Sequence, residues 1–127
     1  MFVRSIVVLC LLSLFVVVIG CGDDDDSSTN SSSPDMRVSP SALGFSPGEN
    51  VHYLIVQNDG TGTLNWSATA ADAWVMLDPA SSSVTTSHDT LTVEVNRSLV
   101  QQGIVDTSYI YITSDGGNDT ILVDVVN

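Results

Sequence analysis

The sequence contains no lysine, and its three arginines stand against fifteen aspartate and glutamate residues, giving a formal net charge of −12. Arg4 lies in the first twenty residues, so a chain without that segment would carry −13, one positive charge fewer. Proteins bind phosphate backbones and anionic lipid surfaces mainly through cationic side chains. The scarcity of cations therefore argues against nucleic acid as a partner.

Cysteine and histidine are also scarce. Cys10 lies inside an apolar N-terminal run and Cys21 follows that run, so modification of Cys21 would leave no thiol pair for a disulfide. The histidines are His52, in an expected strand, and His88, in an expected loop, and we interpret both as structural or solvated. Most nucleophile and base pairs are thus missing, and we expect no catalytic residue and no cofactor.

The apolar run itself is short. Residues 6–19 are fourteen in number, fewer than the roughly 20 that a membrane-spanning helix requires, and we interpret residues 1–20 as a signal peptide. The residues Val18-Ile19-Gly20-Cys21 resemble the lipobox of bacterial lipoproteins. This resemblance implies cleavage before Cys21 and acylation of its sulfur and new N-terminus, with fatty chains such as palmitate.

A lipidated Cys21 predicts a membrane anchor and a location in the bacterial cell envelope. Each buried methylene contributes about 0.8 kcal/mol, so two or three acyl chains give durable attachment. We expect the protein to be anchored in the outer membrane, and exposure of the protein at the cell surface is one alternative there. Two alternatives remain, a soluble exported protein after ordinary signal cleavage and an uncleaved membrane helix.

Residues 21–35 have the composition of a disordered tether. The segment GDDDDSSTNSSSPD, residues 22–35, has five acids and no residue able to build a core. Fourteen flexible residues span about 20 Å root-mean-square and at most about 48 Å. The acidic run resembles the surface-export signal of Bacteroidetes lipoproteins. A charged, solvated linker that carries no sorting signal would have the same composition.

Residues 36–127 predict a single all-β domain, because apolar residues alternate with polar ones and turn signals interrupt them every few residues. About seven short strands favour an antiparallel sandwich of immunoglobulin type, with a small barrel as the alternative. We expect a loop at 80–84, a short helical turn within 97–103, and a hairpin turn at 115–119. The expected strands are 51–58, 63–69, 73–77, 91–96, 108–114 and 120–126.

These residues carry a family resemblance. The order of Leu43 and Phe45, a strand ending at Asn58, Trp66, a second tryptophan opening AWVMLDP, and the later segments LTVEVN and IYITSDGG resembles the BACON domain. The name stands for Bacteroidetes-associated carbohydrate-binding, often N-terminal. The resemblance covers nearly all of residues 37–126 and implies a seven-stranded sandwich of the kind found in carbohydrate-active and surface proteins.

Carbohydrate binding requires exposed aromatic rings, and the strand pattern predicts three. If Ile110 and Ile112 point inward, Tyr109 and Tyr111 share the outer face about 6.8 Å apart. Tyr53 should face outward from the other sheet. The alternative is that these tyrosines only cover their sheets through cross-strand pairing. The domain would then be a structural spacer or a module that contacts another surface protein.

Two other chemistries receive less support. Glycine-rich segments at 58–63 and 115–119 contain oxygen donors, but turn formation explains them better than calcium binding, and we expect no metal. Glu94, Asp106 and Asp124 fall on outward strand positions or turns, which does not favour a glycoside hydrolase site. We also expect Trp66 and Trp74 in the core, since a small domain needs their buried area.

Overall fold

The computed structural model describes residues 32–127, which form one compact unit. The expected signal peptide, Cys21 and most of the expected tether lie outside these described residues. Secondary structure consists of one short 3-10 helix, η1 (Arg97–Leu99), and strands, which confirms the all-β prediction. The strands are β1 (Met36–Ser39), β2 (Ala42–Phe45), β3 (Val51–Asn58), β4 (Leu64–Ala70), β5 (Val75–Asp78), β6 (Ser81–Val84), β7 (His88–Val95), β8 (Val105–Ser114) and β9 (Gly117–Val126).

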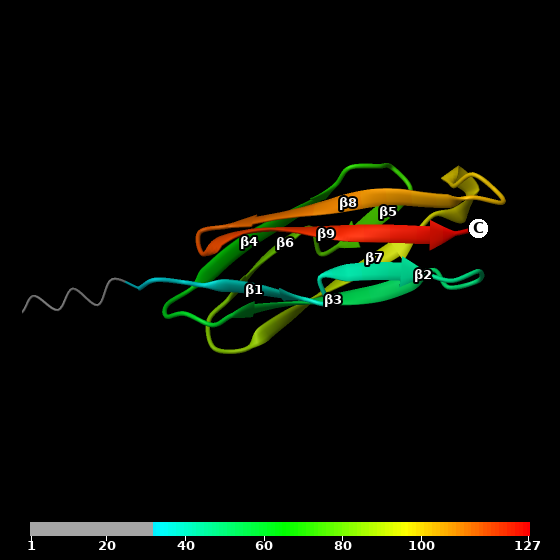
Figure 1. Ribbon diagram of the computed structural model, residues 1–127. Coiled ribbons are helices and arrows are strands. Elements are labelled where there is room, and N and C mark those ends of the chain that lie inside the picture. Colours follow the sequence, from blue (N-terminus) through cyan, green and yellow to red (C-terminus); the bar gives the residue numbers. More distant parts are fainter. Residues whose placement is uncertain (1–31) are drawn as a thin grey trace, which may run out of the picture. The chain divides into compact units, whose positions relative to one another are not determined.

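The strands form two sheets packed face to face, so the sandwich prediction is confirmed and the barrel alternative is not. One sheet has the order β1-β3-β7-β5 and the other the order β2-β9-β8-β4-β6. Figure 1 shows β8 and β9 in one layer and β3 and β7 in the other. All neighbouring strands are antiparallel except β2 and β9, which run parallel. The sandwich is therefore antiparallel, as predicted, apart from this one edge.

The strand count also exceeds the expected seven, for two reasons. Residues 36–45 cross from one sheet to the other, with β1 paired to β3 and β2 paired to β9. Pro40 lies between them, where its missing N–H would break a continuous ladder. In addition, residues 81–84, expected as a loop, form β6 along the edge of β4. His88, also expected in a loop, is the exposed first residue of β7.

The core lies between the sheets and follows the predicted alternation. Leu91, Val93 and Val95 are buried, and Leu54 and Val56 of the neighbouring strand face the same side. His52 also points inward, with its ring 4.5 Å from that of Phe45 in an edge-to-face arrangement, so it packs at the margin of the core. Every buried apolar residue of the described part lies between Val38 and Val125. A fragment of residues 32–127 thus contains this complete core.

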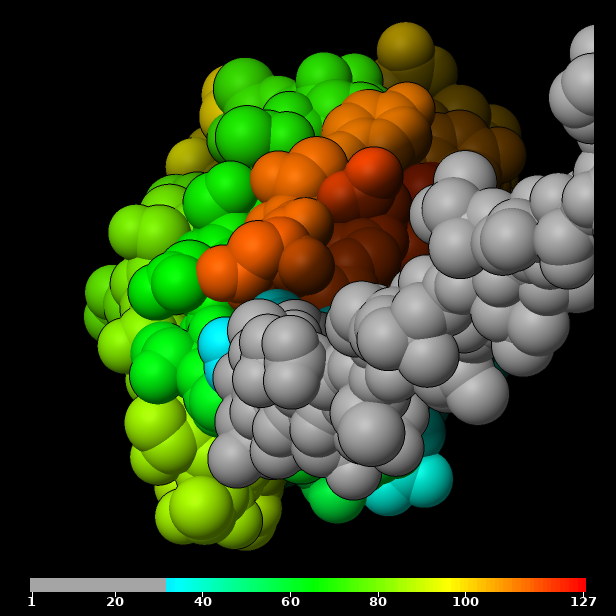
Figure 2. Space-filling model, turned by 90° about the vertical axis from the view of Figure 1, so that its left-hand side faces the viewer, coloured from blue at the N-terminus to red at the C-terminus, as the bar shows by residue number. Residues whose placement is uncertain are grey.

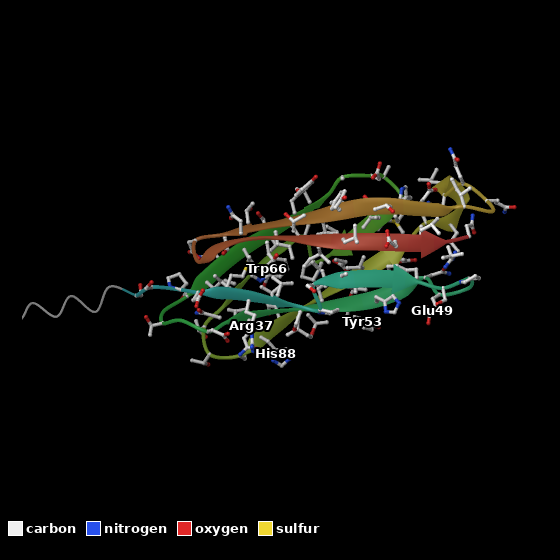
Figure 3. The ribbon with its side chains drawn as sticks, viewed as in Figure 1. Arg37, Glu49, Tyr53, Trp66 and His88 are labelled. Carbon is white, nitrogen blue, oxygen red and sulfur yellow. The ribbon has the colours of Figure 1, made fainter. Side chains whose placement is uncertain are left out.

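The two tryptophans are buried, as predicted, and Trp66 links the two sheets. Its side chain is 3% exposed, and its indole Nε1 donates a hydrogen bond to Asp89 Oδ2 at 3.0 Å. Trp66 belongs to β4 and Asp89 to β7, so this bond crosses the interior. Figure 3 shows Trp66 between the two layers, whereas Tyr53 and His88 lie at the opposite surface of the lower layer.

The first described residues are bound to the domain. The N–H of Thr61 donates to the carbonyl of Ser33 at 2.9 Å, and the N–H of Asp59 donates to the carbonyl of Asp35 at 2.8 Å. Asn58 accepts from the N–H of Asp35 at 3.1 Å. Gly60 permits this close approach, because a Cβ there would stand 2.2 Å from the Ser33 carbonyl oxygen. The chain therefore enters the sandwich beside the β3–β4 loop.

Arg97 joins the segments at the other end of the sandwich. Its guanidinium donates to Asn50 Oδ1 at 2.8 Å and to the carbonyl of Val126 at 2.7 Å. It also donates to the carbonyls of Ser46 and Glu49. One side chain thus fixes the β2–β3 loop, η1 and the last strand together. No helix within residues 32–127 is long and apolar enough to cross a membrane.

Candidate functional site

Tyr109 and Tyr111 lie side by side on the outer face of the five-stranded sheet. Ile110 and Ile112 alternate with them along β8 and are fully buried, as the sequence pattern predicted. The tyrosine side chains are 43% and 46% exposed. Their ring centroids are 6.5 Å apart and their planes differ by 22°. The sheet therefore presents two nearly parallel aromatic rings to solvent.

Tyr53 does not join this pair. It is 57% exposed on the outer face of the four-stranded sheet, opposite Thr92 of β7. The hydrophobic core separates it from Tyr109 and Tyr111, as the expected topology implied. A ligand bound across the two β8 tyrosines could not reach Tyr53 at the same time.

Threonine side chains flank Tyr111, and a leucine lies beside Tyr109. The threonines are Thr69 of β4 and Thr120 of β9, and the leucine is Leu122 of β9. Further along the same face, Thr107 donates a hydrogen bond to Asp124 at 2.7 Å. We call this surface the tyrosine face and define it by Ser67, Thr69, Thr107, Tyr109, Tyr111, Thr113, Thr120, Leu122 and Asp124.

A depression of about 390 Å³ lies at the hairpin end of the tyrosine face, lined by Asn65, Trp66, Ser67, Thr113, Ser114 and Asp115. Figure 2 views the sandwich from that end and shows the orange β8–β9 hairpin beside green β4. Ser67 Oγ and Thr113 Oγ1 share a hydrogen bond of 3.0 Å. A smaller hollow of about 220 Å³ adjoins Asp124 at the β2–β9 edge. The rings therefore lie on a face that has a hollow near each end.

Asp115 is held in place at the depression by Asn65. The Asn65 side-chain amide donates to one carboxylate oxygen at 2.7 Å, and its main-chain N–H donates to the other at 2.9 Å. These two hydrogen bonds lower the pKa of Asp115, because they stabilise the charged form. The carboxylate therefore stays ionised and available as an acceptor to lower pH than a free aspartate.

The sequence did not identify Asn65, Ser67, Thr113 and Asp115 as parts of one site. The alternation of apolar and polar residues in β4 does place Asn65 and Ser67 on the outer side, so their orientation could be predicted from the sequence. Their proximity to Asp115 depends on the register of β4 against β8, in which Ser67 pairs with Thr113. Asn65 and Asp115 are 50 residues apart in the chain, and no local pattern fixes that register.

We predict that Asp115→Asn lowers the melting temperature at neutral pH. An ordinary aspartate has a pKa of 3.8 and the folded value lies below it, so the ionised group contributes stability above pH 3.8. That contribution is lost as the pH falls through the folded pKa. The variant should therefore differ from the parent at pH 7 and differ by less at about pH 3, below the ordinary pKa.

Thermal melts of residues 32–127 at the two pH values test this expectation. Asp72→Asn, in the exposed turn before β5, is the control for a change of net charge alone. Equal losses in both variants at pH 7 would assign the effect to net charge and not to the Asn65 contacts.

Metal binding has no evident site in the part of the chain that the structure describes. Within residues 32–127, no group of three or more histidine, cysteine, aspartate or glutamate side chains gathers so as to hold an ion. The outward carboxylates of Asp124 and Asp115 instead have hydrogen-bond donors from Thr107 and Asn65. Their visible role is therefore to accept hydrogen bonds.

Solved structures with this fold come from several classes of protein. The E. coli chaperone DraB matches with a TM-score of 0.62 and 11% identity, over 72% of this chain and 54% of DraB. A Porphyromonas gingivalis W83 protein of unknown function matches with a TM-score of 0.66 and 18% identity, over 76% and 48%. The chain spans about half the length of such structures, 57% for the periplasmic chaperone SfaE.

One further match is part of an enzyme. A Bacteroides ovatus GH5 xyloglucanase, solved with a XXXG heptasaccharide, matches with a TM-score of 0.51 and 15% identity. The matched region covers 72% of this chain and 19% of the xyloglucanase chain. At these identities the likeness concerns the fold alone.

Sequence comparison identifies the family. No curated protein matches the chain significantly. The family model described as the viral BACON domain matches residues 35–127, which include every strand of both sheets and the tyrosine face. The predicted resemblance is thereby confirmed, and the chain belongs to the BACON domain family.

Proposed function

We propose that this protein is a non-catalytic module of the bacterial cell envelope that binds carbohydrate on its tyrosine face and is anchored by lipid on Cys21. The observation that carries the binding proposal is the exposed, nearly parallel pair of rings on β8. The C–H surfaces of pyranose rings pack on aromatic faces, and sugar hydroxyls pair with amide, hydroxyl and carboxylate groups. The tyrosine face offers both kinds of contact.

Family and fold support a binding module over an enzyme. BACON membership and the immunoglobulin-like fold are both consistent with a non-enzymatic domain. The fold match to part of a xyloglucanase shows that such a sandwich can accompany carbohydrate chemistry in one chain. The lipobox resemblance at Cys21 supports the envelope location, outside the described residues.

Lipidation predicts that Cys21→Ser abolishes acylation, because the hydroxyl cannot replace the thiol in the lipoprotein pathway. Cells expressing the full chain are grown with labelled palmitate, and the label and the membrane fraction are followed. We expect label and membrane association in the parent and neither in the variant. Cys10→Ser is the control, since Cys10 lies within the expected signal. Absence of label from the parent would contradict the anchor.

Carbohydrate binding predicts that the double variant Tyr109→Ala/Tyr111→Ala loses glycan retention. Aromatic contacts contribute about 0.5–1.5 kcal/mol each, so losing both should weaken binding about tenfold or more. Residues 32–127 are applied to a glycan array and to immobilised polysaccharides. The melting temperature should change little, because both side chains lie on the outer face of the sheet and outside the core.

Tyr53→Ala is the matched control, since it removes an exposed tyrosine from the opposite sheet. We expect it to retain glycan as the parent does. No retention of any glycan by the parent would contradict the binding function and leave a spacer or protein-interaction module. The search for a partner chain would then start from three exposed apolar residues, Leu99 in η1, Ile104 just before β8 and Val105 at its start.

A further inference from the structure

We propose that the ligand of the tyrosine face is an uncharged, extended polysaccharide chain and not an anionic glycan or a single sugar. This inference rests on the proposed carbohydrate-binding function. It adds the charge and the length of the ligand, and each follows from a separate feature of the face.

The charge follows from the composition of the five-stranded sheet. Its strands, β2, β9, β8, β4 and β6, contain no lysine, arginine or histidine. Of their three aspartates, Asp124 lies on the tyrosine face, whereas Asp106 and Asp119 share the register of the buried residues of β8 and β9. An anionic glycan on this surface would find no cationic partner within the sheet. Repulsion between like charges would also weaken its approach, most strongly at low ionic strength.

The two arginines of the described residues are engaged elsewhere. Arg37, on β1 of the other sheet, pairs with Asp59 at 3.1 Å and donates to Gln57 at 3.1 Å. The guanidinium of Arg97 is bound to Asn50 and to main-chain carbonyls at the loop end of the sandwich. Neither side chain supplies a free cation to the tyrosine face.

The same face suits neutral hydroxyl groups. A sugar hydroxyl both donates and accepts, and the face offers threonine and serine hydroxyls that do the same. Carboxylates stand at two places along it, Asp115 in the hairpin-end depression and Asp124 beside the β2–β9 hollow. Each accepts hydrogen bonds only, which matches hydroxyl donors and disfavours a carboxylate or sulfate on the ligand.

The length follows from the alignment of the contacts along β8. Tyr109, Tyr111 and Thr113 occupy alternate positions of one strand, so successive side chains stand about 6.8 Å apart and the row is about 14 Å long. The depression continues the row to Asp115. One sugar unit can cover one ring but not both rings and the depression. A chain lying along β8 can contact all three.

The test compares retention of residues 32–127 on neutral and anionic polysaccharides. Neutral xyloglucan or another uncharged glucan, a uronic-acid polymer, a sulfated polymer and the corresponding monosaccharides serve as probes. We expect retention on a neutral polymer, about tenfold or greater preference over its monosaccharide, and little change between about 0.05 and 0.5 M NaCl. Retention on the anionic polymers should be absent.

Two lysine variants test the electrostatic reason. Thr120→Lys places a cation beside Tyr111, and Thr92→Lys places one beside Tyr53 on the opposite sheet. Both change net charge equally. We expect Thr120→Lys, but not Thr92→Lys, to acquire retention on the uronic-acid polymer at low salt and to lose it again at high salt. Melting curves confirm that both variants are folded.

The outcomes separate the two proposals. Retention of an anionic polymer by the parent, abolished in Tyr109→Ala/Tyr111→Ala, overturns the neutral-ligand inference and keeps carbohydrate binding. Equal affinity for monosaccharide and polymer overturns the extended-chain inference in the same way. Failure to retain any glycan removes the carbohydrate function and this inference with it. Equal gains in the two lysine variants contradict local charge as the basis of selectivity.

Discussion

Trp66→Ala is expected to lower the free energy of unfolding of residues 32–127 by about 3–5 kcal/mol, the range for removing a buried aromatic side chain. The indole lies between the sheets and is 3% exposed. Small domains have only about 5–15 kcal/mol of stability in total. The variant should therefore be marginally folded at best. Urea denaturation followed by far-ultraviolet circular dichroism measures the change.

Trp66→Phe separates packing from hydrogen bonding. Phenylalanine refills most of the volume, but it leaves Asp89 without the N–H that now donates to it at 3.0 Å. We expect this variant to lose about 1–3 kcal/mol, less than alanine does. Tyr53→Ala, at an exposed strand position, is the control for loss of an aromatic residue. A Trp66→Ala variant as stable as Tyr53→Ala would show that the indole is not packed in the core.

The strands that the sequence predicted well are those in which periodicity and turn chemistry agree. Residues 51–58 match β3 in full, and 120–126 fall within β9. The hairpin between β8 and β9 forms at Asp115 and Gly116, and Gly117 has a φ of 117°. Such positive φ values favour glycine, so this turn was identifiable from local residues alone.

The elements that were missed depend on partners distant in the chain. In β6 only Val84 is buried, and three serines occupy the other positions, so no apolar alternation marks it as a strand. Its structure comes from pairing with β4, where Ser82 lies opposite Trp66. Likewise, β1 and β2 are four residues each, and their assignment to different sheets depends on β3 and β9.

The candidate site divides in the same way. Alternation within β8 was enough to place Tyr109 and Tyr111 on one outer face, because a strand projects successive side chains to opposite sides. The depression at Asn65 and Asp115 was not predictable, since it requires the register between two strands. The proposed neutral ligand depends on a third property, the absence of cations from five strands that only the topology groups together.

Asn58→Ala is expected to have an effect of similar size, a loss of about 4 kcal/mol from four hydrogen bonds at roughly 1 kcal/mol each. Asn58 Oδ1 accepts from the N–H groups of Asp35 and Gly60, at 3.1 and 3.0 Å. Its Nδ2 donates to the carbonyls of Gly62 and Thr85, at 3.0 and 3.3 Å. Chemical denaturation of residues 32–127 measures the loss.

The same substitution should release residues 33–35, the last residues of the expected tether. With Asn58 absent, the N–H of Asp35 loses its acceptor, and the contacts of residues 33–35 with the β3–β4 loop weaken. Amide hydrogen exchange should accelerate at Asp35 and Thr61 before the core strands open. Asn118→Ala is the matched control, because Asn118 is exposed and accepts from the N–H of Ser114 at 3.3 Å. Equal stability and equal exchange at Asp35 in the two alanine variants would show that Asn58 does not hold residues 33–35 in place. The main-chain hydrogen bond between Ser33 and Thr61 would then be the contact that holds them.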